Sequence, residues 1–375
     1  MSDIAILGAG PAGLALARLL HLGGVECAVY ERDADQHART QGGSLDLGAD
    51  SGLRAITACG LTEEFDRLAR PQGQHTNYFD QHGQLLLATD AEDEGEARPE
   101  IDRLELRTML LESLPAGTVR WNRDVVSVTQ TGNRWRITFS DGQHVDADLV
   151  VGADGINSRT RPLVTDVPPA YTGVTLIAGE IAKPRLDSYA AELVGEGAGL
   201  AFAPDQAFLM QRNGDGSIQV YYAQRRAEDP RRAIGTVLHD PAFIRTELDR
   251  ELADWSPRMR GVLDEVERHF VWWPLYVVPA RQTWREHSGV TLIGDAAHIM
   301  PPYSGQGVNM ALLDALELGR ALAEHADTDA AIAAYEKSML ARMDPIATAT
   351  TTYENLVLNP DGPKALLDLV RTGGR

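Results

Sequence analysis

The sequence has few cysteines, few basic residues relative to acidic ones, and no long apolar run. Its 375 residues include two cysteines, Cys27 and Cys59, neither of them in a CxxC or CxxH pattern. We therefore expect two small apolar side chains in a reducing compartment, and no metal site built on them. There is no apolar stretch of about 18 residues and no basic segment before an apolar one, so the sequence predicts a cytoplasmic protein without a transmembrane helix.

Acidic residues outnumber basic ones by 54 to 35, which gives a formal net charge of −19. A surface of this kind repels phosphate backbones and anionic lipid. We therefore expect a small-molecule substrate, with no nucleic acid and no membrane as partner. The oligomeric state stays open between monomer and dimer.

The hydrophobic pattern predicts an α/β fold. An apolar run at 4–7, a helical pattern at 11–22 and a strand at 25–30 form one βαβ unit. Buried-strand patterns return at 148–152 and 290–293, and alternating strands dominate 170–278. Further predictions are helices at 53–68, 104–114, 242–255, 307–324 and 328–342, a strand at 144–151, a solvated acidic loop at 89–100 and a helical C-terminal tail. We expect one discontinuous α/β domain with a β-rich insertion.

A glycine-rich turn, GAGPAG, connects the first strand to the first helix. Gly8 permits the tight turn, Gly10 lets a pyrophosphate approach the backbone, and Gly13 lets the helix pack closely on the strand. The phosphates would sit at the helix N-terminus, at Pro11 and Ala12, because free N–H groups and the helix dipole favour anions there. The motif predicts a bound dinucleotide.

Glu31 and Arg32 stand at the end of the second strand. An acid at this point binds the ribose hydroxyls of an adenosine, and an arginine could meet the 2′-phosphate of NADP. With Glu31 intact and further motifs downstream, we interpret the dinucleotide as FAD.

Two further segments follow buried strands. The first, at residues 154–161, begins with Asp154 and Gly155; its alternative interpretation is an ordinary strand-to-helix turn. The second runs from Gly294 to Asn309. In it, Asp295 can bind ribityl hydroxyls, and the N–H groups of 305–308 can face the flavin pyrimidine edge, where a helix N-terminus stabilises negative charge. We expect His298 to be a packed or hydrogen-bonded structural residue.

With these three motifs in order, the chain resembles the class A flavoprotein monooxygenases, the para-hydroxybenzoate hydroxylase-like family, over essentially its whole length. The resemblance implies a Rossmann-like FAD-binding domain with an inserted β-sheet substrate domain and a C-terminal helix. It also implies that Asp154 belongs to a segment linked to FAD and NAD(P)H use. No second strand–GxGxxG–helix unit occurs, which is typical of this class, where NADPH or NADH visits transiently as reductant.

A narrower resemblance is to the tetracycline-inactivating flavin monooxygenases, carried by residues 31–33, 42–47, 100–107 and 294–309. It implies roles around FAD for Arg32, Asp46, Arg107 and Asp295, with Arg107 near the ribityl or isoalloxazine region. The positions implied to bind FAD in the last segment are Gly294, Asp295, Pro302, Gly305, Gly307, Val308 and Asn309. Three polar positions that hold tetracycline in that family fall here at Ala178, Gly199 and Gln219, and Tyr303 replaces a phenylalanine.

The substrate cavity is expected between the flavin edge and the inserted sheet. Its predicted wall consists of Ala178, Gln211, Gln219, Tyr221, Trp273, Pro302 and Tyr303. The alternative for the pair Trp272 and Trp273 is core packing. An aromatic wall of this kind favours a flat aromatic or polyketide-like substrate.

The resemblance also implies a division of the chain into domains. Residues 1–72, 102–168 and 282–342 would form the FAD-binding domain, and 73–101 with 169–281 the substrate-binding domain. Residues 343–375 would form a C-terminal helical segment that bridges the two domains or contributes to a dimer contact.

The expected reaction is an FAD-dependent NAD(P)H:O₂ monooxygenation. A flavin C4a-hydroperoxide would hydroxylate an electron-rich aromatic, enol or polyketide-like molecule, with a tetracycline as one candidate. Because the flavin does the chemistry, no protein residue is assigned as a catalytic acid or base, and no metal is expected. The alternatives are a flavin-dependent reductase or oxidase, a flavoprotein that sequesters a ligand without turnover, and an NADP-only dehydrogenase.

Overall fold

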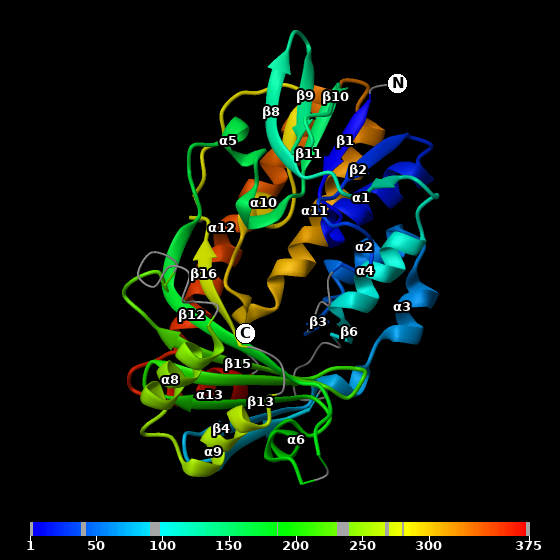
Figure 1. Ribbon diagram of the computed structural model, residues 1–375. Helices are drawn as coiled ribbons and strands as arrows, with labels where there is room; N and C mark the ends of the chain where they lie inside the picture. Colours follow the sequence, from blue (N-terminus) through cyan, green and yellow to red (C-terminus); the bar gives the residue numbers. More distant parts are fainter. Residues whose placement is uncertain are drawn as a thin grey trace.

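A five-stranded parallel sheet forms one part of the molecule, the upper part in Figure 1. The computed structural model describes residues 3–38, 43–90, 98–185, 187–230, 240–266, 270–279 and 281–372. In spatial order the strands are β17 (Val290–Leu292), β11 (Leu149–Gly152), β1 (Ile4–Leu7), β2 (Cys27–Tyr30) and β7 (Val119–Arg120). Every residue of β1, β11 and β17 is buried, as expected for continuous apolar runs in a covered parallel sheet. The predicted α/β fold is confirmed.

Helices from both ends of the chain pack beside this sheet. The helix α1 (Pro11–Leu22) lies against α11 (Gln306–Glu324) and α4 (Arg103–Glu112). The predicted helix at 53–68 is wrong as a single element. It divides into α2 (Gly52–Ala58) and α3 (Thr62–Leu68), because Gly60 between them adopts a φ of +70°, which ends the first helix.

The predicted strand at 144–151 also divides. Its first half, β10 (His144–Ala147), joins β9 (Arg134–Phe139) and β8 (Val125–Thr131) in a three-stranded antiparallel sheet, whereas its second half is β11 of the parallel sheet. Asp148 separates the halves, and its backbone N–H and carboxylate bond the backbone of Asp3. Alternation within one strand does not reveal that its two halves pair with different partners.

A seven-stranded sheet forms the other part of the molecule, the lower part in Figure 1. All its neighbouring strands are antiparallel except the pair β13 and β4. In spatial order the strands are β16 (Val271–Val277), β12 (Ala170–Ile181), β15 (Ile218–Arg225), β14 (Gln206–Arg212), β13 (Ala198–Ala203), β4 (Thr76–Asp80) and β5 (Leu85–Thr89). A small sheet of β3 (Ser44–Asp46) and β6 (Glu100–Asp102) lies apart from it.

The two faces of the seven-stranded sheet contribute to different apolar clusters. One cluster includes Phe208, Tyr222 and Trp272 together with residues of α6 (Tyr189–Val194), α8 (Pro241–Glu251) and α9 (Pro257–Gly261). The other includes Leu176, Ala223 and Leu275 together with residues at the end of the chain. We call this second side the inner face. Strand alternation therefore assigns each side chain of the sheet to one face.

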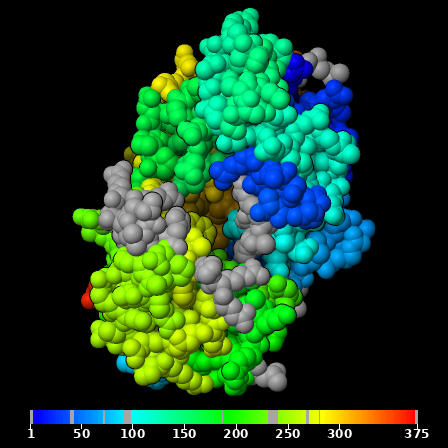
Figure 2. All heavy atoms as spheres, viewed as in Figure 1, coloured from blue at the N-terminus to red at the C-terminus, as the bar shows by residue number. Residues whose placement is uncertain are grey.

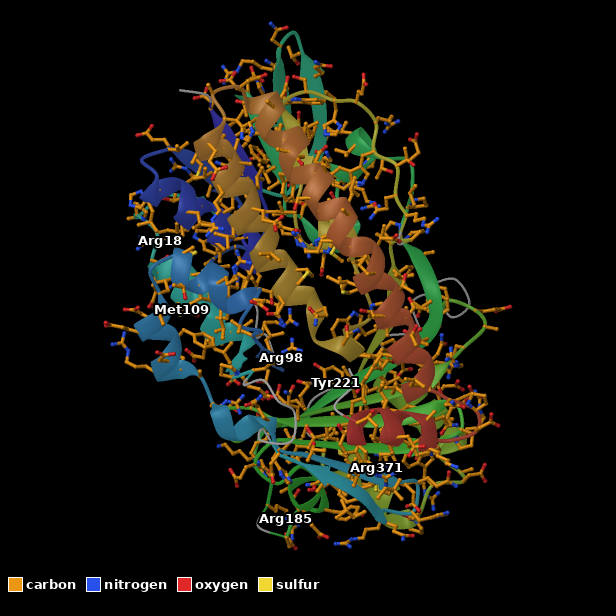
Figure 3. The ribbon with its side chains drawn as sticks, turned by 180° about the vertical axis from the view of Figure 1, so that it is seen from behind. Arg18, Arg98, Met109, Arg185, Tyr221 and Arg371 are labelled. Carbon is orange, nitrogen blue, oxygen red and sulfur yellow. The ribbon has the colours of Figure 1, made fainter. Side chains whose placement is uncertain are left out.

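The helix α12 (Thr328–Val357) connects the two parts of the molecule, as Figure 3 shows from behind. Its first half packs in the cluster of the parallel sheet and its last residues pack on the inner face, followed by α13 (Lys364–Arg371). The prediction that this helix ends near Arg342 is wrong, because it continues through Pro345. Arg342 forms ion pairs with Asp314 and Glu317 of α11, so tertiary contacts outweigh the local cost of the proline.

The short elements are the 3₁₀ turns η1 (Pro71–Gln74), η3 (Gly155–Asn157), η5 (Val262–Asp264) and η6 (Pro302–Ser304), and the helices α5 (Arg161–Val164) and α10 (Asp295–His298). Within the described ranges, no helix combines the length and the apolar character that a membrane span requires.

Candidate active site

The turn between β1 and α1 leaves open space at one glycine and none at the other two. A Cβ atom at Gly8 would lie 2.3 Å from the Ala153 carbonyl oxygen, and one at Gly13 would lie 2.1 Å from the Gly8 carbonyl oxygen. A Cβ atom at Gly10 would meet no heavy atom within 4 Å. Packing therefore requires Gly8 and Gly13, whereas Gly10 leaves room in front of the helix that begins at Pro11. A pyrophosphate fits this space.

Glu31 and Arg107 are both buried beside the glycine turn. The backbone N–H of Ala9 donates to Glu31 Oε2 over 2.7 Å, and that of Asp33 donates to Oε1 over 3.0 Å, which fixes the carboxylate at the end of β2. The Arg107 Nε donates to the Ala9 carbonyl oxygen over 3.1 Å, and its Nη1 to that of Gln36 over 3.1 Å. The structure thus holds Arg107 at the turn itself.

Asp154 begins the turn after β11. Its Oδ2 accepts a hydrogen bond of 2.7 Å from the Arg159 backbone, while its buried Oδ1 has no partner among the described residues. Burial raises the pKa of this carboxyl in spite of these hydrogen bonds. Farther along the segment, Arg161 is buried and donates to the carbonyl oxygens of Ala296 and Ala297, at 2.9 and 2.8 Å. The segment therefore supports the backbone that carries Asp295.

The three predicted motifs meet in space. Gly8 lies against Ala153, next to Asp154, and Arg161 of the second motif holds α10 of the third. A Cβ atom at Gly294 would lie 3.3 Å from the Cβ of Ala12 in the first motif. The sequence left the second motif open between a site and an ordinary turn; these contacts show that it packs against the other two motifs.

His298 is a structural residue, as the sequence predicts. Its Nε2 lies 2.5 Å from Asp314 Oδ2, which also accepts a 2.8 Å hydrogen bond from the Gly294 backbone. Burial lowers the pKa of His298, but the Asp314 carboxylate outweighs it, so the net shift is upward. The pair fixes Gly294 at a φ of +60° and leaves the neighbouring Asp295 side chain exposed.

The first turn of α11 has unobstructed backbone at Gly307 and a fully hydrogen-bonded side chain at Asn309. A Cβ atom at Gly307, next to Val308, would meet no heavy atom within 4 Å, whereas one at Gly305 would lie 2.4 Å from Asp46 Oδ1. Asp46 itself pairs with Arg98 at 2.9 Å. The Asn309 side chain is fully buried, and its partners are Gly48, Ser51, Gly52, Asp46 and Gly305. The predicted cofactor role of Asn309 therefore cannot use its side chain, which fastens residues 46–52 to α11.

The predicted substrate residues of the sheet share its inner face. The register pairs Ala178 with Tyr221, Leu176 with Trp273, and Gln211 with Gln219. Tyr303, beside Pro302 in η6, packs against the cluster on this face. Figure 2 shows a hollow between the two parts of the molecule. Figure 3 labels Tyr221 and Arg98, which lie where these two parts adjoin.

Two residues considered for the substrate site, Gly199 and Trp272, do not face the hollow. A Cβ atom at Gly199 would lie 2.8 Å from the Leu193 carbonyl oxygen of α6, so this position belongs to the outer face. Trp272 is also on the outer face, buried under Arg226 at 4.7 Å, whereas Trp273 is 43% exposed. Core packing is thus correct for Trp272 alone.

Glu100 is a buried acid in a segment where the sequence predicts a solvated loop. Residues 89–100 were expected to form a solvated loop; 91–97 lie outside the described residues, but Glu100 is buried in β6, which corrects that prediction. Its Oε1 accepts a 2.9 Å hydrogen bond from Gln211, whose own Oε1 accepts one from the Ser44 backbone. Burial raises the pKa of Glu100 to about 7, although the Arg70 charge lowers it in part. Gln211 therefore links the inner face to the β3–β6 sheet.

Arg103 is a second residue that the sequence did not single out. It begins α4 and is half-buried, and no hydrogen bond or ion pair of its guanidinium occurs among the described residues. Its charge partly offsets the effect of burial, which raises the pKa of the Tyr221 phenol. A cation thus lies close to the aromatic wall.

A separate cavity of about 620 Å³ opens beside the second motif. Its lining includes Arg32, Asn157, Ser158 and Arg159. Both arginines are exposed, and neither guanidinium has an acidic partner in the described part of the chain. In a protein of net charge −19 this is a local cationic site next to the cofactor turn.

The sequence matches the family described as FAD binding domain over residues 1–350. This chain belongs to that family. It is a class A flavin monooxygenase, an FAD-dependent enzyme. The glycine turn, the buried Glu31 and the open backbone at Gly307 are therefore parts of an FAD-binding fold.

Curated relatives cover almost the full length of this monooxygenase. It is 30% identical to the monooxygenase penA of Penicillium thymicola, over 97% of this chain and 92% of that protein. It is also 30% identical to the 3-amino-4-hydroxybenzoate 2-monooxygenase PtmB3 of Streptomyces platensis, over 97% and 90%.

Solved structures share the fold of this monooxygenase. HpxO of Klebsiella pneumoniae, in complex with FAD and uric acid, has a TM-score of 0.81 at 20% identity, over 99% of this chain and 93% of that one. The tetracycline destructase Tet(51) has a TM-score of 0.74 at 21% identity, over 100% and 95%.

Proposed function

We propose that this enzyme uses FAD, NAD(P)H and O₂ to hydroxylate a flat, electron-rich aromatic molecule that carries a hydroxyl group. The observation that carries the proposal is that Tyr303 of η6, directly before α11, packs against the aromatic inner face of the seven-stranded sheet, so this face adjoins the unobstructed backbone at Gly307. When bound, FAD supplies the redox chemistry, taking electrons from NAD(P)H and activating O₂. The protein binds, orients and shields the reactants.

We infer that four parts of the chain hold FAD. Glu31 receives the ribose, the space at Gly10 receives the pyrophosphate, and Asp295 is exposed toward the ribityl chain. The N-terminus of α11 at Gly307 and Val308 favours negative charge at the pyrimidine edge. Asp46 forms an ion pair with Arg98, and its carboxylate packs against the loop at Gly305.

We infer that the reductant reaches the enzyme at the cationic cavity. Arg32 and Arg159 line it, and within the described ranges neither guanidinium has an acidic partner. Guanidinium groups bind phosphate well. The 2′-phosphate of NADPH would pair with one of these guanidinium groups, and NADH has no such phosphate. We therefore propose NADPH as the preferred reductant.

The inner face favours an aromatic substrate. Tyr221 and Trp273, with ring centroids 6.0 Å apart, supply flat apolar surface, and Arg103 favours an anionic group nearby. Hydroxylated aromatic acids fit this combination, in keeping with the name of the relative from Streptomyces platensis. Ala178 and Gln219 offer a tetracycline few polar anchors, and Gly199 faces away, so we propose weak tetracycline binding.

We also propose that the division into domains follows the two sheets. The FAD-binding domain would comprise 1–72, 102–168 and 282–342, and the substrate-binding domain 73–101 and 169–281. Residues 343–375 would bridge them, as the contacts of α12 and α13 support.

The test combines cofactor consumption with isotope tracing. FAD-loaded protein is mixed with NADPH or NADH under ¹⁸O₂, alone or with 3-amino-4-hydroxybenzoate, uric acid or a tetracycline. We expect an aromatic acid to accelerate NADPH oxidation and to acquire one ¹⁸O atom, detected by mass spectrometry. NADPH oxidation without ¹⁸O in product would indicate an oxidase or reductase. Ligand binding without NADPH oxidation would indicate a sequestering protein.

A further inference from the structure

Two glutamine side chains lie side by side on the inner face, next to Tyr221. Gln211 of β14 and Gln219 of β15 are paired directly across the two strands, and Gln219 stands two residues before Tyr221 on the same face. Gln219 is 7% exposed and Gln211 is half-buried. Directly opposed side chains of an antiparallel pair lie close enough to act on one group together. We call these two side chains the amide pair.

A backbone N–H fixes the orientation of the first amide. The Ser44 N–H, which can only donate, gives its hydrogen bond to Gln211 Oε1 over 3.3 Å. The oxygen must therefore face β3, and the amide nitrogen Nε2 donates to Glu100 Oε1 of β6 over 2.9 Å. A primary amide nitrogen carries two N–H groups. One N–H of Gln211 thus remains without an acceptor among the described residues.

A backbone carbonyl fixes the second amide in the opposite sense. Gln219 Nε2 donates to the Gly179 carbonyl oxygen of β12 over 2.7 Å, and a carbonyl oxygen can only accept. In the part of the chain that the structure describes, no hydrogen bond reaches Gln219 Oε1, and this oxygen is not one of the fully buried unpaired atoms, so it keeps contact with open space. The amide pair therefore offers an unused donor at Gln211 and an unused acceptor at Gln219.

This combination matches a ligand that carries an acceptor and a donor on adjacent atoms of one edge. A lactam, the cyclic amide of a ring, holds its C=O and N–H in the cis arrangement, so both can face the amide pair at once. An open-chain secondary amide is trans and directs the two groups to opposite sides. A carboxylate has acceptors only, so one of its oxygens would meet the Gln219 oxygen.

The amide pair also adjoins the surface on which a flat ring is proposed to lie. Tyr221 and Trp273 supply that surface, and a ring stacked on Tyr221 would direct one edge toward Gln219. Arg103, whose charge acts on the Tyr221 phenol, favours an anionic group nearby. An acidic hydroxyl group on the same ring would supply that charge without a carboxylate.

We propose that the amide pair makes this enzyme select a hydroxylated aromatic lactam. Gln211 Nε2 donates to the lactam carbonyl oxygen, and Gln219 Oε1 accepts a hydrogen bond from the lactam N–H. Both residues determine specificity and take no part in the redox chemistry. This inference rests on the proposed function, because it uses the inner face as the place where the substrate binds.

Two ligands that differ at one ring position test the amide pair. 4-Hydroxycarbostyril is a flat hydroxylated lactam, and 4-hydroxycoumarin has a ring oxygen in place of its N–H. Isothermal titration calorimetry of the FAD-loaded protein without NADPH measures both dissociation constants in the absence of turnover. We expect the wild type to bind the lactam about 10-fold or more tightly than the lactone, which leaves Gln219 Oε1 without a donor. Equal affinities, a preference for the lactone, or binding of neither would overturn the proposal.

Two variants should have different signatures. Gln219→Met removes the acceptor for the N–H and should reduce the lactam preference to within about 3-fold. Gln211→Met removes the donor to the carbonyl oxygen, which both ligands have, so it should weaken both by about 10-fold and keep the preference. Gln130→Met, at an exposed glutamine of β8, is the matched control and should bind both as the wild type does.

A merely structural role would give another pattern, because distortion of the site would weaken lactam and lactone alike in both variants. Full lactam preference in Gln219→Met, or unchanged affinities in Gln211→Met, would contradict the proposal. Circular dichroism and FAD absorbance verify that each variant is folded and loaded. If a variant does not fold, the wild-type comparison of the two ligands still decides.

Hydroxylation is measured separately, with NADPH under ¹⁸O₂. A lactam that binds with the expected pattern but acquires no ¹⁸O would count against the proposed function and leave the amide pair in place. Hydroxylation of an aromatic molecule by an enzyme that binds lactam and lactone equally would overturn the amide pair and leave the proposed function in place.

Discussion

At the scale of single residues, neighbouring glycines in the same turn have different physical tasks. A Cβ atom at Gly10 would have no heavy atom within 4 Å. A Cβ atom at Gly13 would instead lie 2.1 Å from the Gly8 carbonyl oxygen. We therefore propose that Gly10 serves the cofactor, whereas Gly13 serves the fold. Substitution by alanine separates the two roles.

We predict that Gly10→Ala folds but binds FAD poorly, because its methyl group occupies the space for the pyrophosphate. Gly13→Ala should instead destabilise the apoprotein by about 1–3 kcal/mol through overpacking. Thermal unfolding of the apoproteins and FAD fluorescence titrations provide the comparison. Wild-type FAD affinity in Gly10→Ala would show that the cofactor lies elsewhere.

The third motif implied that Asn309 binds FAD, but the structure shows its side chain hydrogen-bonded within the protein. Its amide joins five partners in the segment from Asp46 to Gly52 and at Gly305. We predict that Asn309→Ala lowers the free energy of unfolding by about 2–3 kcal/mol, since it leaves several buried groups unpaired. Urea denaturation measures this, with the exposed Asn133→Ala as control. A loss no larger than that of the control would contradict the assignment.

At the scale of elements, α12 and α13 close the inner face from behind. Leu358, at the end of α12, and Leu366 of α13 are both fully buried there. We predict that Leu366→Ala costs about 2–5 kcal/mol, because it opens a cavity in this cluster. The exposed Lys364→Ala on the same helix is the control. Equal unfolding midpoints in urea for the two variants would mean that α13 contributes little to the fold.

At the scale of the whole molecule, three buried titratable groups act on stability in one direction. Burial raises the pKa of Glu100 and of Glu354 from 4.5 to about 7, so between these values the folded protein holds protons that the unfolded chain releases. The free energy of unfolding must then decrease as pH rises through this window. His298, whose raised pKa depends on Asp314, likewise stabilises the fold at low pH and loses that contribution as pH rises.

We therefore predict that the unfolding temperature is higher near pH 5.5 than near pH 8, both approximate values set by these pKa shifts. Glu100→Gln should flatten part of the decrease, because the amide keeps a hydrogen-bonding oxygen and cannot ionise. Calorimetry of the FAD-loaded protein across this range is the measurement. An unfolding temperature that rises with pH would show that these groups are not buried as described.

The sequence predicted the packing of the glycine turn better than the surroundings of the sheet's inner face. Gly8 and Gly13 belong to a local strand–turn–helix–strand pattern, and the structure shows the close packing that the pattern predicts for them. The predicted contact of Glu31 with a ribose stays a prediction. Glu100 was read as part of a solvated loop, since nothing in its neighbourhood indicates burial. Its partner Gln211 is more than a hundred residues away.

By itself, the sequence determined the βαβ unit, the glycine turn and the acidic surface, because these depend on backbone propensities, on the period of apolar residues and on composition. Only the tertiary structure decided which face Gly199 and Trp272 occupy, and that the side chain of Asn309 is engaged. It also decided that the Tyr303 hydroxyl and the Glu354 carboxyl are buried, in the two elements η6 and α12 that contact each other. Burial and hydrogen bonding of these groups depend on contacts between distant segments, and only the folded chain brings those segments together.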